Sequence, residues 1–278
     1  MSAYITWHND DTNETQIWLM TSTAIKRRAT VHDENGRAIF VGPPWRIAAA
    51  VNTEIIWHND STNETQIWFM TEALDEIVRR ATVQDENGKP IFVGPPWRIA
   101  GAAQMREAEP PSIIWHNDST NETQIWFMSG DRIARRATVQ DENGRPIFVG
   151  PPWRIVGAWA NRIDWHNDAT NETQIWHMSH EAILSRATVQ DEKVEPIFVG
   201  PPWHVVGTAD FQDFQDSGPA PFLRHADIAW HNDATNETQI WLTSEDRIAR
   251  RATVQDENGQ PIFVGAPWHI VATANANI

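Results

Sequence analysis

The feature that most constrains the fold of this chain is a unit written five times. The string Trp-His-Asn-Asp-x-Thr-Asn-Glu-Thr-Gln-Ile-Trp begins at Trp7, Trp57, Trp115, Trp165 and Trp230 of the 278 residues. Each copy is followed by Arg-Ala-Thr-Val, then Ile-Phe-Val-Gly, then Pro-Trp and a short apolar run. Units of about 50 residues cannot bury their apolar faces alone, so neighbouring units must stack. The repeats span approximately residues 1–50, 51–108, 109–158, 159–223 and 224–278 of one domain.

Within a unit, apolar and polar residues alternate with the period of a β-strand. Ile5 and Trp7 alternate with Thr6 and His8, and a similar pattern follows each Asn-Asp-x-Thr-Asn-Glu segment. That segment predicts a hairpin turn, with Asn13 and its equivalents in the left-handed conformation. A helix is indicated only weakly, over residues 72–80.

A second hairpin is expected at Asp-Glu-Asn-Gly, which spans Asp33 to Gly36 in the first unit. The fourth unit has Glu192-Lys193-Val194-Glu195 in this region, and we expect its loop to differ. Gly-Pro-Pro-Trp predicts a stiff corner because each Pro fixes φ and lacks an N–H donor.

Repeated units of about four short antiparallel strands favour an all-β fold, a five-bladed β-propeller. A solenoid is the competing repeat architecture, but its short coils and capping repeats are not seen. The chain begins at the Trp-His-Asn-Asp strand and ends with Trp268 to Ala272, which corresponds to the strand preceding that motif elsewhere. We therefore predict a ring closed by the C-terminal strand, which joins the first blade.

Composition narrows the function classes. The formal charge of −15 argues against a nucleic-acid or anionic-membrane surface, and no apolar run is long enough to span a membrane. The absence of Cys excludes a disulfide framework and thiolate chemistry. The N-terminal residues enter a strand pattern directly and show no signal peptide.

The pattern Ile-x-Trp-x-Asn-Asp-x-Thr-Asn-x-x-x-Ile-Trp-x-Met, followed by Trp-x-Ile-Val-Gly, resembles the FG-GAP/VCBS-type propeller repeats of bacterial proteins. The resemblance covers all five units and implies an extracellular or cell-surface location. In that family an Asp-rich calcium loop often follows the Trp-x-Ile-Val-Gly strand. Here residues 51–54 and 159–162 cannot supply such a cage, and Asp210, Asp213 and Asp216 have a spacing of three. We expect no metal and no cofactor. Propeller lectins are the nearest functional analogy.

The polar segment is nearly invariant between copies and has two interpretations. In the structural one, its side chains satisfy the turn backbone and bridge blades. In the functional one, His, Asn and Asp beside Trp bind a sugar, because planar polar side chains bind hydroxyls and an aromatic face covers C–H groups. Recent duplication would also produce this identity. The candidates are His8, Asp10, His58, Asn59, Asp60, His116, Asp118, His166, Asp168, His231 and Asp233.

The Trp that follows each Pro corner is the best candidate for an exposed aromatic. The next residue is Arg in three units and His in two, and this side chain either binds a ligand or pairs with the Asp of a neighbouring hairpin. These candidate pairs are Trp45–Arg46, Trp97–Arg98, Trp153–Arg154, Trp203–His204 and Trp268–His269.

Known catalytic motifs are absent from the sequence, and five near-identical units place their carboxylates in equivalent surroundings, so we predict no enzyme activity. We predict instead a multivalent lectin that binds glycans in the grooves between blades, with no oligomer required. The alternative is a protein-binding scaffold that uses the 209–226 insertion through Phe211, Phe214 and Phe222. A glycoside hydrolase is less favoured.

Overall fold

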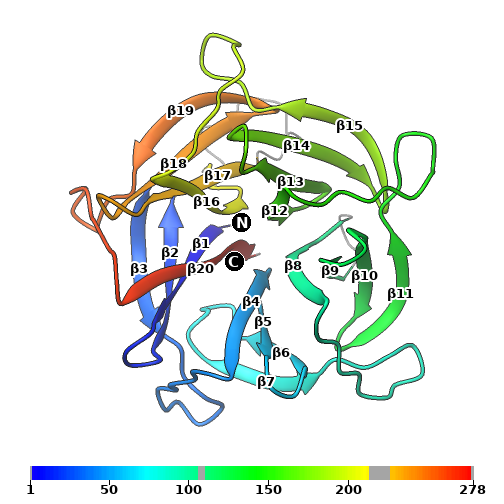
Figure 1. Ribbon diagram of the computed structural model, residues 1–278. Coiled ribbons are helices and arrows are strands. Elements are labelled where there is room, and N and C mark those ends of the chain that lie inside the picture. The colour runs from blue at the N-terminus through cyan, green and yellow to red at the C-terminus, as the bar shows by residue number, and fades with distance from the viewer. Residues whose placement is uncertain (1, 106–109, 213–225, 277–278) are drawn as a thin grey trace.

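The computed structural model describes residues 2–105, 110–212 and 226–276, and these form one closed ring of five blades (Figure 1). Each blade is a four-stranded antiparallel sheet, and the described residues contain no helix. No helix able to cross a membrane is therefore found among them. The five-bladed propeller predicted from the repeats is confirmed.

The strands are given from the innermost to the outermost. Blade 1 holds β20 (Trp268–Ala276), β1 (Ser2–Asn9), β2 (Thr15–Thr21) and β3 (Ala24–Thr30). Blade 2 holds β4 (Trp45–Val51), β5 (Glu54–Asn59), β6 (Thr65–Met70) and β7 (Ile77–Thr82). Blade 3 holds β8 (Trp97–Ala103), β9 (Ser112–Asn117), β10 (Thr123–Ser129) and β11 (Arg132–Thr138). Blade 4 holds β12 (Trp153–Trp159), β13 (Arg162–Asn167), β14 (Glu172–Ser179) and β15 (Ala182–Thr188). Blade 5 holds β16 (Trp203–Ala209), β17 (Asp227–Asn232), β18 (Glu237–Ser244) and β19 (Arg247–Thr253).

The ring closes as predicted, because β20 pairs with β1 from Ser2 opposite Ala276 to Asn9 opposite Trp268. Both chain ends therefore lie near the centre of the ring (Figure 1). Because β20 completes blade 1, the blade that contains both chain ends has four strands, as each of the others does.

The innermost strands face one another around the central axis and carry small residues there. A Cβ added to Gly101 would lie 3.4 Å from the Cβ of Ala158. At Gly157 an added Cβ would lie only 2.6 Å from Thr208 Oγ1. The inner strands are thus packed so closely that a larger residue at Gly157 would displace its neighbour.

Two Trp layers fill the space between blades. The Trp that opens each repeat is 1% exposed, and it stacks at a tilt on the second Trp of its unit at 4.6–4.8 Å between ring centroids. An Arg from the outermost strand covers the second Trp, as Arg80 covers Trp68 at 4.6 Å. Each such Arg also pairs with a Glu in the hairpin of the preceding blade, as Arg80 does with Glu34 at 3.2 Å. Sheet stacking is therefore reinforced at the outer rim.

Two local predictions are corrected by the structure. Residues 72–80 form no helix, because turns occupy 72–75 and β7 then begins at Ile77 in register with β6. The hairpin of the fourth unit does not differ from the others. Val194 takes the left-handed conformation at φ 69° and donates its N–H to Asp191 O, as Gly144 does to Asp141 O.

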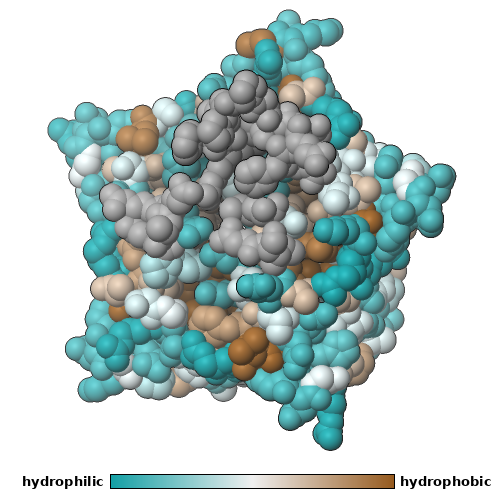
Figure 2. All heavy atoms as spheres, turned by 180° about the vertical axis from the view of Figure 1, so that it is seen from behind, coloured by the Kyte–Doolittle hydropathy of each residue, from teal (hydrophilic) through white to brown (hydrophobic). Residues whose placement is uncertain are grey.

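The predicted left-handed Asn is confirmed in all five blades, with φ values of 58–60° at Asn13, Asn63, Asn121, Asn171 and Asn236. Seen from behind, the molecule has five mostly hydrophilic corners, with apolar groups scattered between them (Figure 2).

Candidate functional site

An Arg or His beside an Asp stands at the start of each inner strand. In blade 2, Arg46 lies on β4 opposite His58 of β5, and its Nε donates to Asp60 Oδ1 at 3.1 Å. Asp60 follows β5 in the turn and its side chain is 57% exposed, while that of Arg46 is 43% exposed. The backbone N–H of Asp60 donates to Pro44 O, which ties the turn to the Pro corner. These contacts keep both charged groups at the surface beside that corner.

The same pair recurs in every blade. Nitrogen–oxygen distances are 2.9–3.3 Å for Arg98–Asp118, Arg154–Asp168, His204–Asp233 and His269–Asp10. The sequence left open whether this Arg or His binds a ligand or pairs with Asp, and the structure shows the Arg or His paired with an Asp of its own blade. An exposed pair of this kind adds little stability, so both groups can be shared with a ligand.

The Trp beside each pair is partly exposed: Trp45, Trp97, Trp153, Trp203 and Trp268. Trp45 packs against the core cluster between blades 1 and 2, together with Ile39 and Val41. Pro43 and Pro44 just before it are exposed. An aromatic edge, a proline corner and an Arg–Asp or His–Asp pair therefore meet at each blade boundary, with two prolines in four corners and Ala266-Pro267 in the fifth.

The motif His lies deeper. His58, His116 and His166 are buried, whereas His8 and His231 are half-buried. His58 Nδ1 lies 3.0 Å from Thr65 Oγ1, and Nε2 is 3.9 Å from Asp60 Oδ1. Burial lowers the pKa of His58, and the nearby Arg46 lowers it further. His58 is therefore neutral at pH 7 and offers one ring nitrogen toward the exposed carboxylate.

Each His also packs across a blade boundary. His8 of blade 1 lies edge-on to Trp57 of blade 2, with ring centroids 6.4 Å apart, and His58 lies in the same way on Trp115. The predicted site residues are thus brought together in the order His, Asp, Arg or His, and Trp, close to the boundaries where we expected grooves.

Most of the invariant polar segment serves the fold. Asn59 is buried, and its Oδ1 accepts hydrogen bonds from the N–H groups of Ser61 and Thr62. Gln66 links Glu64 to the indole N–H of Trp68 at 2.9 and 3.1 Å. Asn59 is consequently not displayed to a ligand, whereas Asp60 and the two residues after it, Ser61 and Thr62, are exposed.

The sequence reading missed five exposed aromatics. Phe40, Phe92, Phe148, Phe198 and Phe263 are 57–59% exposed. Each lies two residues before the Gly that precedes the proline corner, and Phe40 forms an isolated bridge with Glu14 beside the turn. Their identical position in every Ile-Phe-Val-Gly segment, with apolar neighbours on both sides, was the available signal.

The scaffold alternative loses one of its three anchors. Phe211 is 1% exposed, and its N–H donates to Asp227 Oδ2 at 2.8 Å, so it is a core residue and not an exposed anchor. Phe214, Phe222, Asp213 and Asp216 lie outside the described residues. Within residues 2–105, 110–212 and 226–276, no group of three or more His, Asp or Glu is placed to hold a metal ion.

No family model and no curated protein sequence matches the chain. Among solved structures, a nidogen/laminin complex aligns with a TM-score of 0.47 at 10% identity, over 98% of this chain and 97% of that chain. A protein of unknown function from Bacteroides caccae aligns with a TM-score of 0.44 at 11% identity, over 95% of this chain and 77% of that chain. Glutaminyl cyclase of Myxococcus xanthus aligns with a TM-score of 0.39 at 8% identity, over 81% of this chain and 90% of that chain. Likenesses this weak carry no information about the function of this chain.

Proposed function

We propose that this propeller is a multivalent carbohydrate-binding protein with one site at each blade boundary. The observation that carries the proposal is the fivefold repetition of a partly exposed Trp beside an exposed Arg–Asp or His–Asp pair. A carboxylate accepts hydrogen bonds from sugar hydroxyls, a guanidinium donates them, and an indole covers an apolar C–H face.

The repetition itself supports binding to a clustered target. A shallow site buries little area and desolvates many hydroxyls, so each contact is weak. Five equivalent sites on a rigid ring raise the effective affinity by about 10²–10⁴ when the target presents several copies. We also propose that the repeats are of the FG-GAP/VCBS type, that the protein acts outside the cell or at its surface, and that it has no catalytic activity.

The first test is a glycan array probed with the labelled full chain, followed by calorimetry on each hit. We expect binding with a stoichiometry close to five sugars per chain. Replacing Asp60 by Ala should lower the stoichiometry by one and leave the remaining sites unchanged, because Asp60 lies in only one boundary.

A variant with Ala at Asp10, Asp60, Asp118, Asp168 and Asp233 should lose binding altogether. These side chains are 56–70% exposed, so the fold should survive, which thermal unfolding will verify. Unchanged sugar binding by this folded variant would overturn the proposal. A clean array with folded protein would also overturn it and would favour a protein-binding scaffold.

A further inference from the structure

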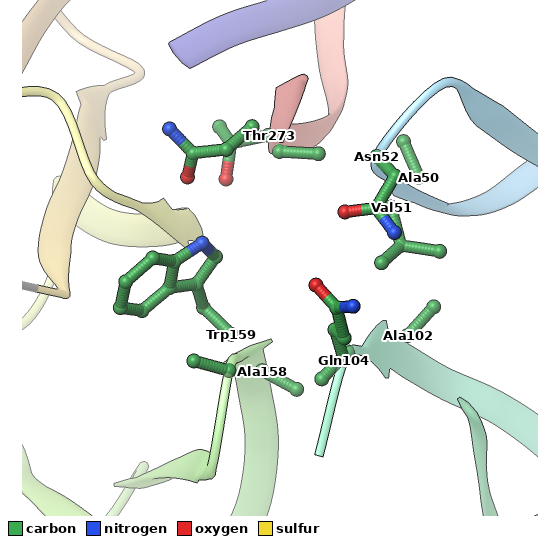
Figure 3. A pocket seen from close by; sticks show the side chains of 12 residues that line it. Ala50, Val51, Asn52, Ala102, Gln104, Ala158, Trp159 and Thr273 are labelled. Carbon is green, nitrogen blue, oxygen red and sulfur yellow. The ribbon is translucent and has the colours of Figure 1, made fainter. Parts of the chain in front are cut away.

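One end of the inner strands departs from the fivefold repeat. There a cavity of about 20 Å³ lies among the C-terminal ends of four inner strands, those of β4, β8, β12 and β20. Its polar lining includes Asn52, Gln104, Thr273 and Asn275, and its apolar lining is mostly Ala. The side chain that has no counterpart in the other blades is Trp159, which stands across the cavity from Asn52 and Gln104 (Figure 3).

Trp159 belongs to a cross-strand row found in blade 4 alone. It lies opposite Arg162 on β13, and Arg162 lies opposite His177 on β14. Arg162 Nη2 donates to Asp164 Oδ2 at 3.0 Å, and both side chains are buried. At the position of Trp159 the other blades carry Val51, Ala103, Ala209 and Ala274. The propeller forms four blades without this row, so the fold does not require it.

Two polar groups at this cavity are free to bind. Trp159 is 9% exposed, and no hydrogen bond of its indole N–H or of the Asn52 side-chain amide is found among the described residues. Other polar groups are already engaged, since Asn275 exchanges hydrogen bonds with the backbone of Asp210 and Thr273 donates to Thr208 O. An indole N–H that lines a cavity and has no partner in the described chain can donate to a hydroxyl bound there.

We infer that this cavity is a single-copy site for the terminal hydroxyl of a neutral sugar or polyol. The lining carries no formal charge, which favours a neutral ligand. A volume of about 20 Å³ admits a hydroxyl-sized group, so the ligand enters end-on and its remaining atoms stay outside. The hydroxyl oxygen accepts from the Trp159 N–H, its hydrogen is donated to the Asn52 amide oxygen, and the indole face covers adjoining C–H groups. The inference does not rest on the five boundary sites.

The experiment is ¹⁹F NMR on the full chain labelled with 5-fluorotryptophan, titrated with glycerol and with methyl α-glucoside. Trp159→Phe removes one resonance and so assigns it. We expect the Trp159 resonance to shift saturably in the millimolar range while the buried Trp7 and Trp57 resonances stay fixed. No shift with either probe up to about 100 mM would overturn the site.

The repeat supplies the matched variants. Asn52→Ala, which introduces the residue that Ala160 provides in blade 4, should weaken the Trp159 response about three- to tenfold by removing one hydrogen bond. Trp159→Ala has precedent at Ala103, so the variant should stay folded in thermal unfolding and show no binding at this end by calorimetry. An unchanged response in Asn52→Ala would contradict the assigned contacts.

The variant with all five boundary aspartates replaced separates the two proposals. It should lose the boundary sites and keep the Trp159 response. If the Trp159 response disappeared together with boundary binding, the cavity would not be an independent site.

Discussion

The backbone N–H of Ile25 donates to the carbonyl of Gln255 at 2.9 Å, and the N–H of Gln255 donates to Thr23 O at the same distance. These bonds join the outermost strand of blade 1 to the hairpin of blade 5. The ring is therefore closed twice, once at its inner edge by β20 and once at its outer edge. Every other blade boundary has the same outer bonds, as between His32 and Ile77 at 2.9 Å.

Removing Trp268–Ala276 should abolish the cooperative fold. The deletion leaves β1 without its inner partner and removes Ala272 and Ala274 from the core that they share with Tyr4, while the outer bonds of Gln255 alone cannot hold the blades together. Far-UV circular dichroism with thermal unfolding measures this. The control is a circular permutant in which a short linker joins Ala276 to Ser2 and the new ends lie in the Asp141–Arg145 hairpin.

The permutant keeps all five sheets and should unfold cooperatively within a few degrees of the parent. A truncated chain that unfolded with the parent's midpoint would show that ring closure contributes nothing to stability.

Val194→Gly should increase the free energy of unfolding by about 1 kcal/mol. Val194 is β-branched, is held at φ 69° and is 54% exposed, so the substitution relieves backbone strain and loses little packing. Urea denaturation measures the change. The reverse substitution, Gly144→Val at φ 76°, should destabilise the protein by at least as much. Equal free energies of unfolding for Val194→Gly and the parent would show that the Val194 backbone is not strained.

Gly94→Ala should destabilise the protein by about 1–3 kcal/mol. An added Cβ would lie 1.9 Å from Asn63 Oδ1, so the Asn63 side chain, in the turn between β5 and β6, would have to move. The double variant Gly94→Ala/Asn63→Gly removes the clashing side chain and keeps a residue that tolerates φ 59°. Its loss should be smaller than the sum of the two single losses. Strict additivity would mean that the two positions do not interact.

Asp227 should make stability fall as the pH rises from about 4 to 7. Burial raises the pKa of Asp227 to about 6, above the unfolded value near 3.9. The folded state therefore binds the proton more tightly, and the stability it contributes is fully present below the unfolded pKa and lost as the pH rises through about 6. Burial lowers the pKa of His58, His116 and His166, and these act in the opposite direction as the pH falls below about 6.5.

Asp227→Asn isolates the carboxyl from that background. The stability of the parent relative to this variant, measured by urea denaturation at each pH, should decline by roughly 2–3 kcal/mol between pH 4 and pH 7. The exposed Asp60→Asn serves as the control and should show no such decline. A constant difference for Asp227→Asn would contradict the raised pKa.

The ring was predictable because alternation, turn residues and repetition all indicate the same architecture. Trp7 and Thr6 point to opposite faces of a strand, Asn13 suits a left-handed turn, and the final strand matches the one missing from blade 1. Local chemistry misled twice. Residues 72–80 weakly indicated a helix, and Val194 in place of Gly suggested a new loop, but in both cases pairing with neighbouring strands determined the backbone.

The candidate site was predictable only in part. Both Asn59 and Asp60 are identical in all five copies, so the sequence cannot show which of them is available to a ligand. Asn59 Oδ1 accepts hydrogen bonds from two N–H groups of the turn, whereas the Asp60 side chain is exposed. Phe211 was expected to be an exposed anchor because the chain there departs from the repeat. Its side chain is buried, and its backbone N–H donates to the Asp227 carboxylate. Trp159, Arg162 and His177 could have been found by asking which residues break the repeat and lie opposite one another.

The small residues of the inner strands also limit how many copies of the unit can share one ring. Gly157 faces Thr208 and Gly207 faces Thr273 with no space for another Cβ, so the curvature of the ring is matched to five units. Inserting a sixth identical unit would push these strands apart and leave the axis unfilled. Gain or loss of a single copy by recombination, which such similar units invite, would thus produce a chain unable to close, and the number of units is constrained by packing at the axis.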